Sequence, residues 1–186
     1  MIGQNPKEIT WWKAADFMEH CRSHSVSPVL RLLLLSNGAV VNLLRALLLE
    51  PVTLERIDQK EMILEGEQAQ LFRQPEGTQG LLRDVYLVQT ARRRIHASSF
   101  FPASTLGPRF FHEMVRSESP LGSIIETQGL VARRDGIEIC RLRDPRMAGE
   151  LGCAAHQALW GRRYQFVIPG EASASIFEVF SPSLSN

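Results

Sequence analysis

The residues best suited to chemistry in this sequence are an arginine and a glutamate, Arg83 and Glu178, which lie far apart along the chain. A guanidinium can bind a carboxylate through two parallel hydrogen bonds. A carboxylate can accept a hydrogen bond from a hydroxyl group, and it can also accept a proton. Together the two side chains could hold a small ligand that carries an acid group at one end and a hydroxyl group at the other.

Both residues fall in segments where apolar residues alternate with others. Because side chains alternate between the two faces of a strand, Arg83 shares a face with Val85 and Leu87, and Glu178 shares a face with Ile176. A buried charge without a partner is costly, so each residue needs a counter-charge, water or a ligand. The pattern leaves open an Arg83–Glu178 ion pair, edge positions open to water, or an apolar ligand pocket with two charged anchors.

The elements that must position these residues are expected to be helices followed by an antiparallel sheet. Apolar spacing, caps and turn residues predict helices at 10–25, 28–35, 39–49, 109–116 and 145–158. Alternation predicts strands at 52–57, 81–89, 94–101, 164–168 and 175–180, and one long strand or a strand pair at 129–141. This order is typical of an α+β fold, and 186 residues fit a single domain spanning residues 1–186.

The charge balance argues against a nucleic-acid binder. The formal net charge is +1, and the basic residues are almost all arginine, with only three lysines. A nucleic-acid binding domain normally carries a strong basic excess. The basic run at 92–94 lies at an expected hairpin turn, where we expect it to be solvated.

The cysteines predict a reducing environment. Cys21, Cys140 and Cys153 are odd in number and widely spaced, so a disulfide framework is not expected. The first ten residues lack the layout of a signal peptide, and the longest apolar runs are too short to span a membrane. These features favour a cytoplasmic protein without a membrane span.

We expect neither a metal nor a cofactor. His20, Cys21 and His24 fall within one helical turn, and Cys153 and His156 have a ligand-like spacing. A structural zinc site normally has four ligands in recognisable pairs, and these residues do not form such pairs. The sequence also lacks a glycine-rich phosphate loop and a nucleophile elbow.

Six short motifs follow one another along the chain. They are Leu35-Ser36-Asn37-Gly38, Leu82-Arg83-Asp84-Val85, Phe101-Pro102-Ala103-Ser104-Thr105-Leu106, Ser119-Pro120-Leu121-Gly122, Arg134-Asp135-Gly136-Ile137-Glu138-Ile139, and Trp160-Gly161-Arg162-Arg163 followed by Phe177-Glu178-Val179-Phe180-Ser181-Pro182. In this order they resemble the chorismate lyase (chorismate pyruvate-lyase) family over roughly residues 28 to 184. The resemblance implies an antiparallel sheet with helices packed on one side and flaps over a buried ligand site.

The resemblance also implies roles for particular residues. It assigns Arg83 to the ring carboxylate of the ligand, and it assigns Glu178 to the ring hydroxyl and to proton transfer. Both are therefore expected to be catalytic. Leu121 and Gly38 are expected to bind substrate through their main chains, Gly38 with an uncertainty of one residue.

A second carboxylate on the substrate needs another cation. Arg163 is the first choice, ahead of Arg162 and Arg134.

Two stretches depart from the family pattern. Ala97 and Ser98 replace a glycine and an arginine, and the chain is longer than expected between Leu130 and Trp160, where residues 142–154 are expected to form a different lid.

The function implied by the resemblance is a cofactor-free lyase. It would eliminate pyruvate from chorismate to give 4-hydroxybenzoate for quinone biosynthesis, acting as a monomer or homodimer. Two alternatives remain: a non-enzymatic module of the same fold that binds a small effector, as in certain bacterial transcription regulators, and a related lyase that makes a different hydroxybenzoate. Release of pyruvate separates the enzymes from the module, and the identity of the product separates the two lyases.

Overall fold

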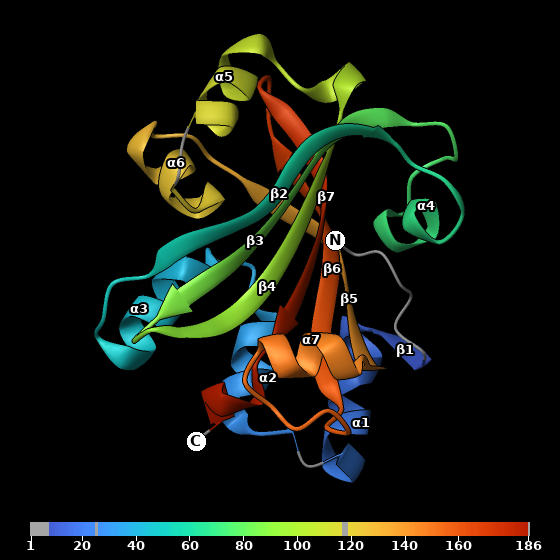
Figure 1. Cartoon of the computed structure of the whole chain (residues 1–186), viewed down its shortest axis with the longest axis vertical. Helices are drawn as coiled ribbons and strands as arrows, with labels where there is room; N and C mark the ends of the chain where they lie inside the picture. Colours follow the sequence, from blue (N-terminus) through green and yellow to red (C-terminus); the bar gives the residue numbers. More distant parts are fainter. Residues whose placement is uncertain (1–7, 25, 117–118, 186) are drawn as a thin grey trace.

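The computed structural model describes residues 8–24, 26–116 and 119–185. In these residues seven strands form an antiparallel sheet in the order β1-β5-β6-β7-β4-β3-β2 (Figure 1). The strands are β1 (Glu8–Lys13), β2 (Thr53–Ile63), β3 (Gln79–Gln89), β4 (Arg92–Pro102), β5 (Arg133–Arg143), β6 (Leu159–Ile168) and β7 (Ala172–Phe180). The helices are α1 (Ala14–His24), α2 (Pro28–Leu35), α3 (Val40–Leu48), α4 (Gly66–Phe72), α5 (Pro108–Arg116), α6 (Leu121–Thr127) and α7 (Pro145–Glu150), with short 3-10 turns η1 (Ala103–Thr105) and η2 (Pro182–Ser185).

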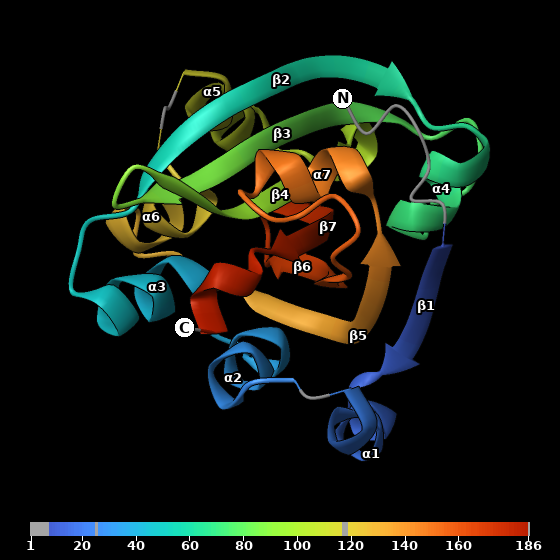
Figure 2. The ribbon, with the colours of Figure 1, turned by 60° about the horizontal axis from the view of Figure 1, so that its bottom comes forward.

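The sheet curls, and helices lie against both of its faces (Figure 2). One face packs against α1, α2, α3, α5 and α6 through two apolar clusters. The opposite face packs against α4 and α7 through a third cluster. The α+β class is confirmed. We call the first face the pocket face, because Arg83 and Glu178 alternate along β3 and β7 with residues that belong to its clusters.

Two hairpins meet in the middle of the sheet. The β3–β4 hairpin and the β6–β7 hairpin join where β4 pairs with β7, and there Ala97 lies opposite Glu178. The predicted turn between β6 and β7 is confirmed, and Gly170 has a φ of 78°, a left-handed conformation that glycine adopts without strain. The pairing of the hairpins brings residues from both halves of the chain onto one surface.

The second and third predicted helices are confirmed as α2 and α3. The hydroxyl of Ser27 accepts a hydrogen bond from the amide of Leu30 at 3.2 Å, and Pro28 occupies the first turn of α2. Helix α3 ends where Leu49 takes a left-handed conformation with a φ of 56°. These local signals fix the short connection at residues 36–39, which lies beside the pocket described below.

The predicted helix at 10–25 is wrong at its start. Residues 10–13 belong to β1, in which Trp11 pairs with Cys140 of β5, and the helix begins at Ala14. Ser25, at the predicted end, lies outside the described residues. The strand arises from a pairing with a segment far along the chain, which overrides the local helical spacing.

The predictions for the regions around α4, α6 and α7 also need correction. Helices α4 and α6 were not predicted, and the predicted helix at 145–158 ends at Glu150. The expected lid at residues 142–154 is wrong in its position, because Ala148 and Leu151 are buried in the cluster on the face opposite the pocket.

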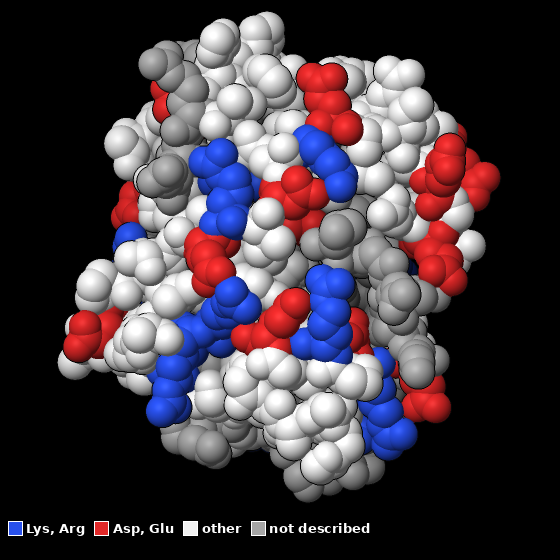
Figure 3. All heavy atoms as spheres, in the orientation of Figure 1, with Lys and Arg blue, Asp and Glu red and all other residues white. Residues whose placement is uncertain are grey.

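Charged side chains of both signs are intermixed on the face of the molecule shown in Figure 3. This surface matches the net charge of +1. Among the described residues, the helices lack the combination of length and apolar character that crossing a membrane requires.

Candidate functional site

The register of the sheet places the two predicted anchors in neighbouring rows of the pocket face. One row runs across four strands through Arg83, Ser99, Ile176 and Tyr164. The next row runs through Val85, Ala97, Glu178 and Arg162. Arg83 and Glu178 are therefore two strands and one row apart, on the same face.

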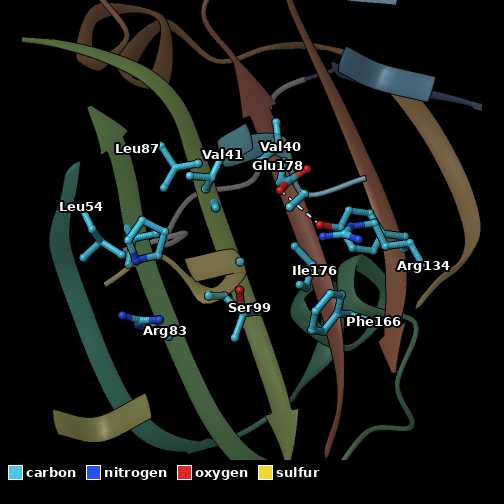
Figure 4. Close-up of a pocket in the computed structure, with 17 residues that line it drawn as sticks. Val40, Val41, Leu54, Arg83, Leu87, Ser99, Arg134, Phe166, Ile176 and Glu178 are labelled. Atoms are coloured by element: carbon cyan, nitrogen blue, oxygen red, sulfur yellow. Dashed lines mark hydrogen bonds between the residues drawn. The ribbon is translucent and has the colours of Figure 1, made fainter. Parts of the chain in front are cut away.

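A cavity lies over these rows and is lined by both anchors. Its floor is the sheet, and its other walls are the start of α3 (residues 39–41), the start of α6 (residues 120–122) and Arg134 of β5. Figure 4 shows Arg83 and Glu178 on separate strands, with Ser99 on the strand between them. Most of the lining is apolar, as in small-ligand sites.

The cavity is small in this arrangement, with a volume of about 50 Å³. Pockets for small ligands usually measure about 300–1,000 Å³. The starts of α3 and α6 lie close together above it, since a Cβ atom added to Gly122 would lie 3.4 Å from the Cβ atom of Ala39. In this arrangement the cavity is therefore smaller than a usual small-ligand pocket.

Arg83 is a buried cation at one end of this cavity. Its side chain is almost fully buried, and its Nη2 donates a hydrogen bond to the carbonyl of Ser119 at 3.1 Å. Burial, with a smaller effect from Arg56, lowers the pKa of Arg83 to about 10. The guanidinium therefore remains charged at neutral pH and can bind an acid group in the cavity.

Glu178 is held by two neighbours on β6. Arg162 Nε donates to its Oε2 at 2.6 Å, and the hydroxyl of Tyr164 donates to its Oε1 at 3.2 Å. Burial, together with the charge of Glu178, raises the pKa of Tyr164 well above its usual value, so its hydroxyl stays a donor. The ion pair of Glu178 is thus with Arg162 and not with Arg83.

Of the two main-chain candidates, Leu121 lines the cavity and Gly38 does not. Leu121, the first residue of α6, lines it directly. Gly38 lies just before the lining residues of α3, and its amide donates to the hydroxyl of Ser36 at 3.0 Å.

The three candidate arginines for a second acid group lie in different places. Arg134 lines the cavity, and its Nη1 donates to the carbonyl of Asn37 at 2.9 Å. Arg163 points to the opposite face of β6, where it pairs with Glu138 at 2.7 Å and lies over the ring of Trp11. The expectation that Arg163 contacts substrate is therefore corrected.

Sequence reasoning did not single out Tyr164 and Ser99, which line the cavity, and it placed Arg134 last of three arginines, although Arg134 is the one of the three that lines the cavity. The strand was expected to begin at Tyr164, whereas β6 begins at Leu159. Had the alternation been extended back to Leu159, it would have placed Arg162 on the same face as Tyr164 and Arg163 on the other face.

A second group of buried polar residues lies behind the pocket, on the other face of β3 and β4. The hydroxyl of Ser98 donates to Asp84, and Nε2 of His96 lies 4.0 Å from Oδ1 of Asp84. Burial lowers the pKa of His96 to about 4, so the imidazole is neutral at physiological pH. The sheet separates these groups from the cavity.

Comparison of the sequence with known families finds one match over most of the chain. The family model described as "Chorismate pyruvate-lyase Rv2949c-like" matches residues 34–186. A "Probable chorismate pyruvate-lyase" of Pseudomonas aeruginosa (strain UCBPP-PA14) is 28% identical over 173 residues, which is 93% of this chain and 92% of that protein. A protein of the same name from strain PAO1 is 27% identical over the same extent of both chains.

The fold is similar to that of the effector domains of bacterial regulators. The effector domain of PhnF from Mycobacterium smegmatis matches with a TM-score of 0.57 and 14% identity, covering 78% of this chain and 90% of that one. A GntR-family transcriptional regulator from Bacillus cereus matches with a TM-score of 0.54 and 13% identity, covering 71% of this chain and 92% of that one. At these identities the similarity shows the fold alone.

Proposed function

The chain belongs to the Rv2949c-like chorismate pyruvate-lyase family, and we propose that it eliminates pyruvate from chorismate to leave 4-hydroxybenzoate. One observation carries the proposal: Arg83 and Glu178, of opposite charge, line the same mostly apolar cavity from separate strands. The carboxylate of the ring binds Arg83, and the ring hydroxyl donates a hydrogen bond to Glu178.

The spacing of the two anchors supports this arrangement. Two strand spacings across the sheet and two residues along it put their Cα atoms on the order of 12 Å apart. Both side chains reach into the cavity, so the gap between their charged ends is suited to one aromatic ring with a substituent at each end. A flat ring also suits the apolar lining between them.

The reaction needs proton transfer and charge stabilisation. The ring carbon that bears the hydroxyl loses its proton, the bond from the neighbouring ring carbon to the enolpyruvyl oxygen breaks, and the ring becomes aromatic. Glu178, beside the hydroxyl, accepts the proton. The enolpyruvyl group leaves as an enolate with the electrons of the broken bond and takes up one proton at its methylene carbon to become pyruvate, so the elimination is balanced when Glu178 gives its proton back. The protein contributes alignment of the breaking bonds, exclusion of water and a positive charge for the leaving group.

Arg134 is the best-placed cation for the enolpyruvyl carboxylate. It lines the cavity, and its guanidinium lies over the rings of Tyr164 and Phe166, at 5.7 and 5.1 Å from their centroids. Its Nε is buried without a hydrogen-bond partner among the described residues. That donor is available to an acid group on the substrate.

The proposal is tested by incubating the purified protein with chorismate. Pyruvate is followed by a coupled reduction with NADH, and the aromatic product is identified by chromatography. We expect pyruvate and 4-hydroxybenzoate in equal amounts. Pyruvate with a different hydroxybenzoate would identify a related lyase, and the absence of pyruvate would refute the lyase assignment.

A second candidate function is a binding module without catalysis. It is favoured by the similarity of the fold to effector domains of regulators. Such a module would bind an aromatic acid between Arg83 and Glu178 but release no pyruvate from chorismate, so the same experiment distinguishes the two functions. For the lyase, we propose further that the product enters quinone biosynthesis in the cytoplasm.

A further inference from the structure

Arg162 is a fully buried arginine that makes contacts in two directions. Its Nε donates to Glu178 Oε2 at 2.6 Å. On the other side, its Nη1 donates to main-chain carbonyls at the end of α2 and just beyond it, those of Leu33 at 2.7 Å and Ser36 at 2.8 Å, with Leu34 at 3.4 Å. A single guanidinium therefore joins the sheet to the connection between α2 and α3.

The charge of this guanidinium is maintained although water does not reach it. Burial disfavours the charged form, but the charge of Glu178 and the contact with Tyr164 outweigh this effect, so the pKa of Arg162 lies above its ordinary value. A buried ion pair is stable only when its geometry is good and further hydrogen bonds satisfy the charged groups. The carbonyls at the end of α2 and of Ser36 supply such bonds to Nη1, whereas Nη2 has no hydrogen-bond partner among the described residues.

The contacts fix the direction of the Glu178 carboxylate without using all of its acceptor positions. An ionised carboxylate offers about four lone-pair sites. Arg162 occupies one on Oε2, and the hydroxyl of Tyr164 occupies one on Oε1. At least one site remains for a hydroxyl group of a ligand.

The same guanidinium is bonded close to the wall of the cavity. The carbonyl of Ser36 lies three residues before Ala39, where the lining segment 39–41 begins. Arg162 therefore joins Glu178 to the connection that leads into this lining segment.

We propose that Arg162 is a positioning residue, which aims Glu178 at the ligand hydroxyl and is itself held in place by the main chain at the end of α2 and just beyond it. This inference rests on the proposed function for the identity of the ligand, but its consequences concern ligand recognition as well as turnover. Arg162 itself does not line the cavity.

The test compares the binding of two probes, 4-hydroxybenzoate and benzoate, by calorimetry. The two acids differ only in the hydroxyl group that Glu178 accepts. We expect the unmodified protein to bind 4-hydroxybenzoate at least tenfold more tightly than benzoate, because the acceptor is charged and buried. In Arg162→Gln and Arg162→Lys we expect the ratio of the two affinities, 4-hydroxybenzoate over benzoate, to fall below threefold. The affinity for benzoate itself should change less than threefold, because the Arg83 anchor is retained.

The matched control is Arg163→Gln, which removes the neighbouring arginine on the opposite face of β6. We expect this variant to keep the ratio of the unmodified protein. Arg162→Lys keeps a buried charge beside Glu178 but cannot reach the carboxylate and the carbonyls of Leu33 and Ser36 together. A ratio in either folded Arg162 variant equal to that of the unmodified protein would overturn the inference.

A further variant decides the question if the Arg162 variants do not fold. Tyr164→Phe removes the second hydrogen bond on Glu178 and leaves Arg162 in place. We expect the affinity ratio of Tyr164→Phe to stay within threefold of that of the unmodified protein. If this variant no longer prefers 4-hydroxybenzoate to benzoate, Tyr164 and not Arg162 sets the direction of Glu178.

Turnover separates this inference from the proposed function. If the unmodified protein prefers 4-hydroxybenzoate but releases no pyruvate from chorismate, the lyase proposal fails, and the positioning role is still decided by the Arg162 variants. If it shows no preference for 4-hydroxybenzoate, the positioning role fails whatever the turnover. In an active enzyme, Arg162→Lys is expected to lower kcat at least tenfold while KM changes less than threefold.

Discussion

Ala97 on β4 and Glu178 on β7 are directly paired in the register of the sheet, so a single methyl group lies beside the carboxylate on the pocket face. Both residues line the cavity. Only a small residue leaves room at this position, because the strand pairing fixes its backbone next to that of Glu178. The open space between the two anchors therefore depends on the size of residue 97.

Replacing Ala97 with leucine is expected to fill this space. Turnover of chorismate and binding of 4-hydroxybenzoate should fall at least 100-fold, whereas overpacking costs only about 1–3 kcal/mol of stability. Steady-state kinetics and thermal unfolding measure the two effects. Ala97→Gly serves as the control and should retain binding; normal activity in folded Ala97→Leu would show that the ligand does not lie over this row.

Arg83→Ala is expected to abolish turnover while the protein stays folded. The variant loses the guanidinium group that binds the ring carboxylate. Charge-assisted pairs of hydrogen bonds of this kind contribute strongly to binding. We expect kcat/KM to fall at least 100-fold, with the far-ultraviolet circular dichroism unchanged. A rate near that of the unmodified protein would exclude Arg83 as the anchor.

Arg134→Gln should separate the two acid groups of the substrate. Chorismate carries the enolpyruvyl carboxylate assigned to Arg134, and benzoate does not. We expect KM for chorismate to rise about tenfold, consistent with loss of a charged hydrogen bond worth about 1.5–3 kcal/mol. The affinity for benzoate should change less than twofold, and an equal loss for both ligands would place the second acid group elsewhere.

The two helices above the cavity are joined by Arg45 of α3. Its Nη2 lies 3.4 Å from the hydroxyl of Ser123, and its Nη1 lies 3.9 Å from Glu126, both on α6. These contacts are partly exposed, and such pairs contribute about 0–1 kcal/mol. Arg45→Gln should therefore speed the dissociation of 4-hydroxybenzoate by about two- to fivefold in stopped-flow experiments. Unchanged dissociation would show that the ligand leaves by another route.

His96 should make the stability of the fold depend on pH. Burial lowers its pKa to about 4, while an unfolded histidine titrates near 6.5. Between these values the unfolded chain binds more protons, so stability present above pH 6.5 is lost as the pH falls toward 4, by about 3 kcal/mol in total.

Thermal unfolding of the unmodified protein and of His96→Gln, each at several pH values, tests this contribution to stability. Carboxylates such as Asp84 also titrate in acid, so the difference between the two proteins isolates the histidine. If both proteins lose the same stability between pH 6.5 and 4, the histidine does not make this contribution.

Local patterns were sufficient to predict that Arg83 and Glu178 each lie on a face with apolar residues. Alternation along a strand depends on neighbouring residues only, and it correctly placed Arg83 with Val85 and Glu178 with Ile176 on one face. The ends of α2 were likewise predicted, because Ser27 and Pro28 are local start signals.

The features that were missed depend on contacts between distant segments. Trp11 belongs to a strand because it pairs with Cys140, far along the chain. The partner of Glu178 is Arg162, and it could not be identified until the start of β6 and its pairing with β7 were known. The position of α7 follows from the apolar cluster that covers Ala148, which involves several strands.

The pairing of β4 with β7 has a consequence for synthesis of the chain. Residues 97 and 178 are about 80 positions apart, and β7 is the last strand in chain order among the described residues. A growing chain that has completed the β3–β4 hairpin already carries its arginine but has no acid facing it. The site as proposed is therefore complete only after β7 has paired with β4, so its two charged residues come together late in the formation of the sheet.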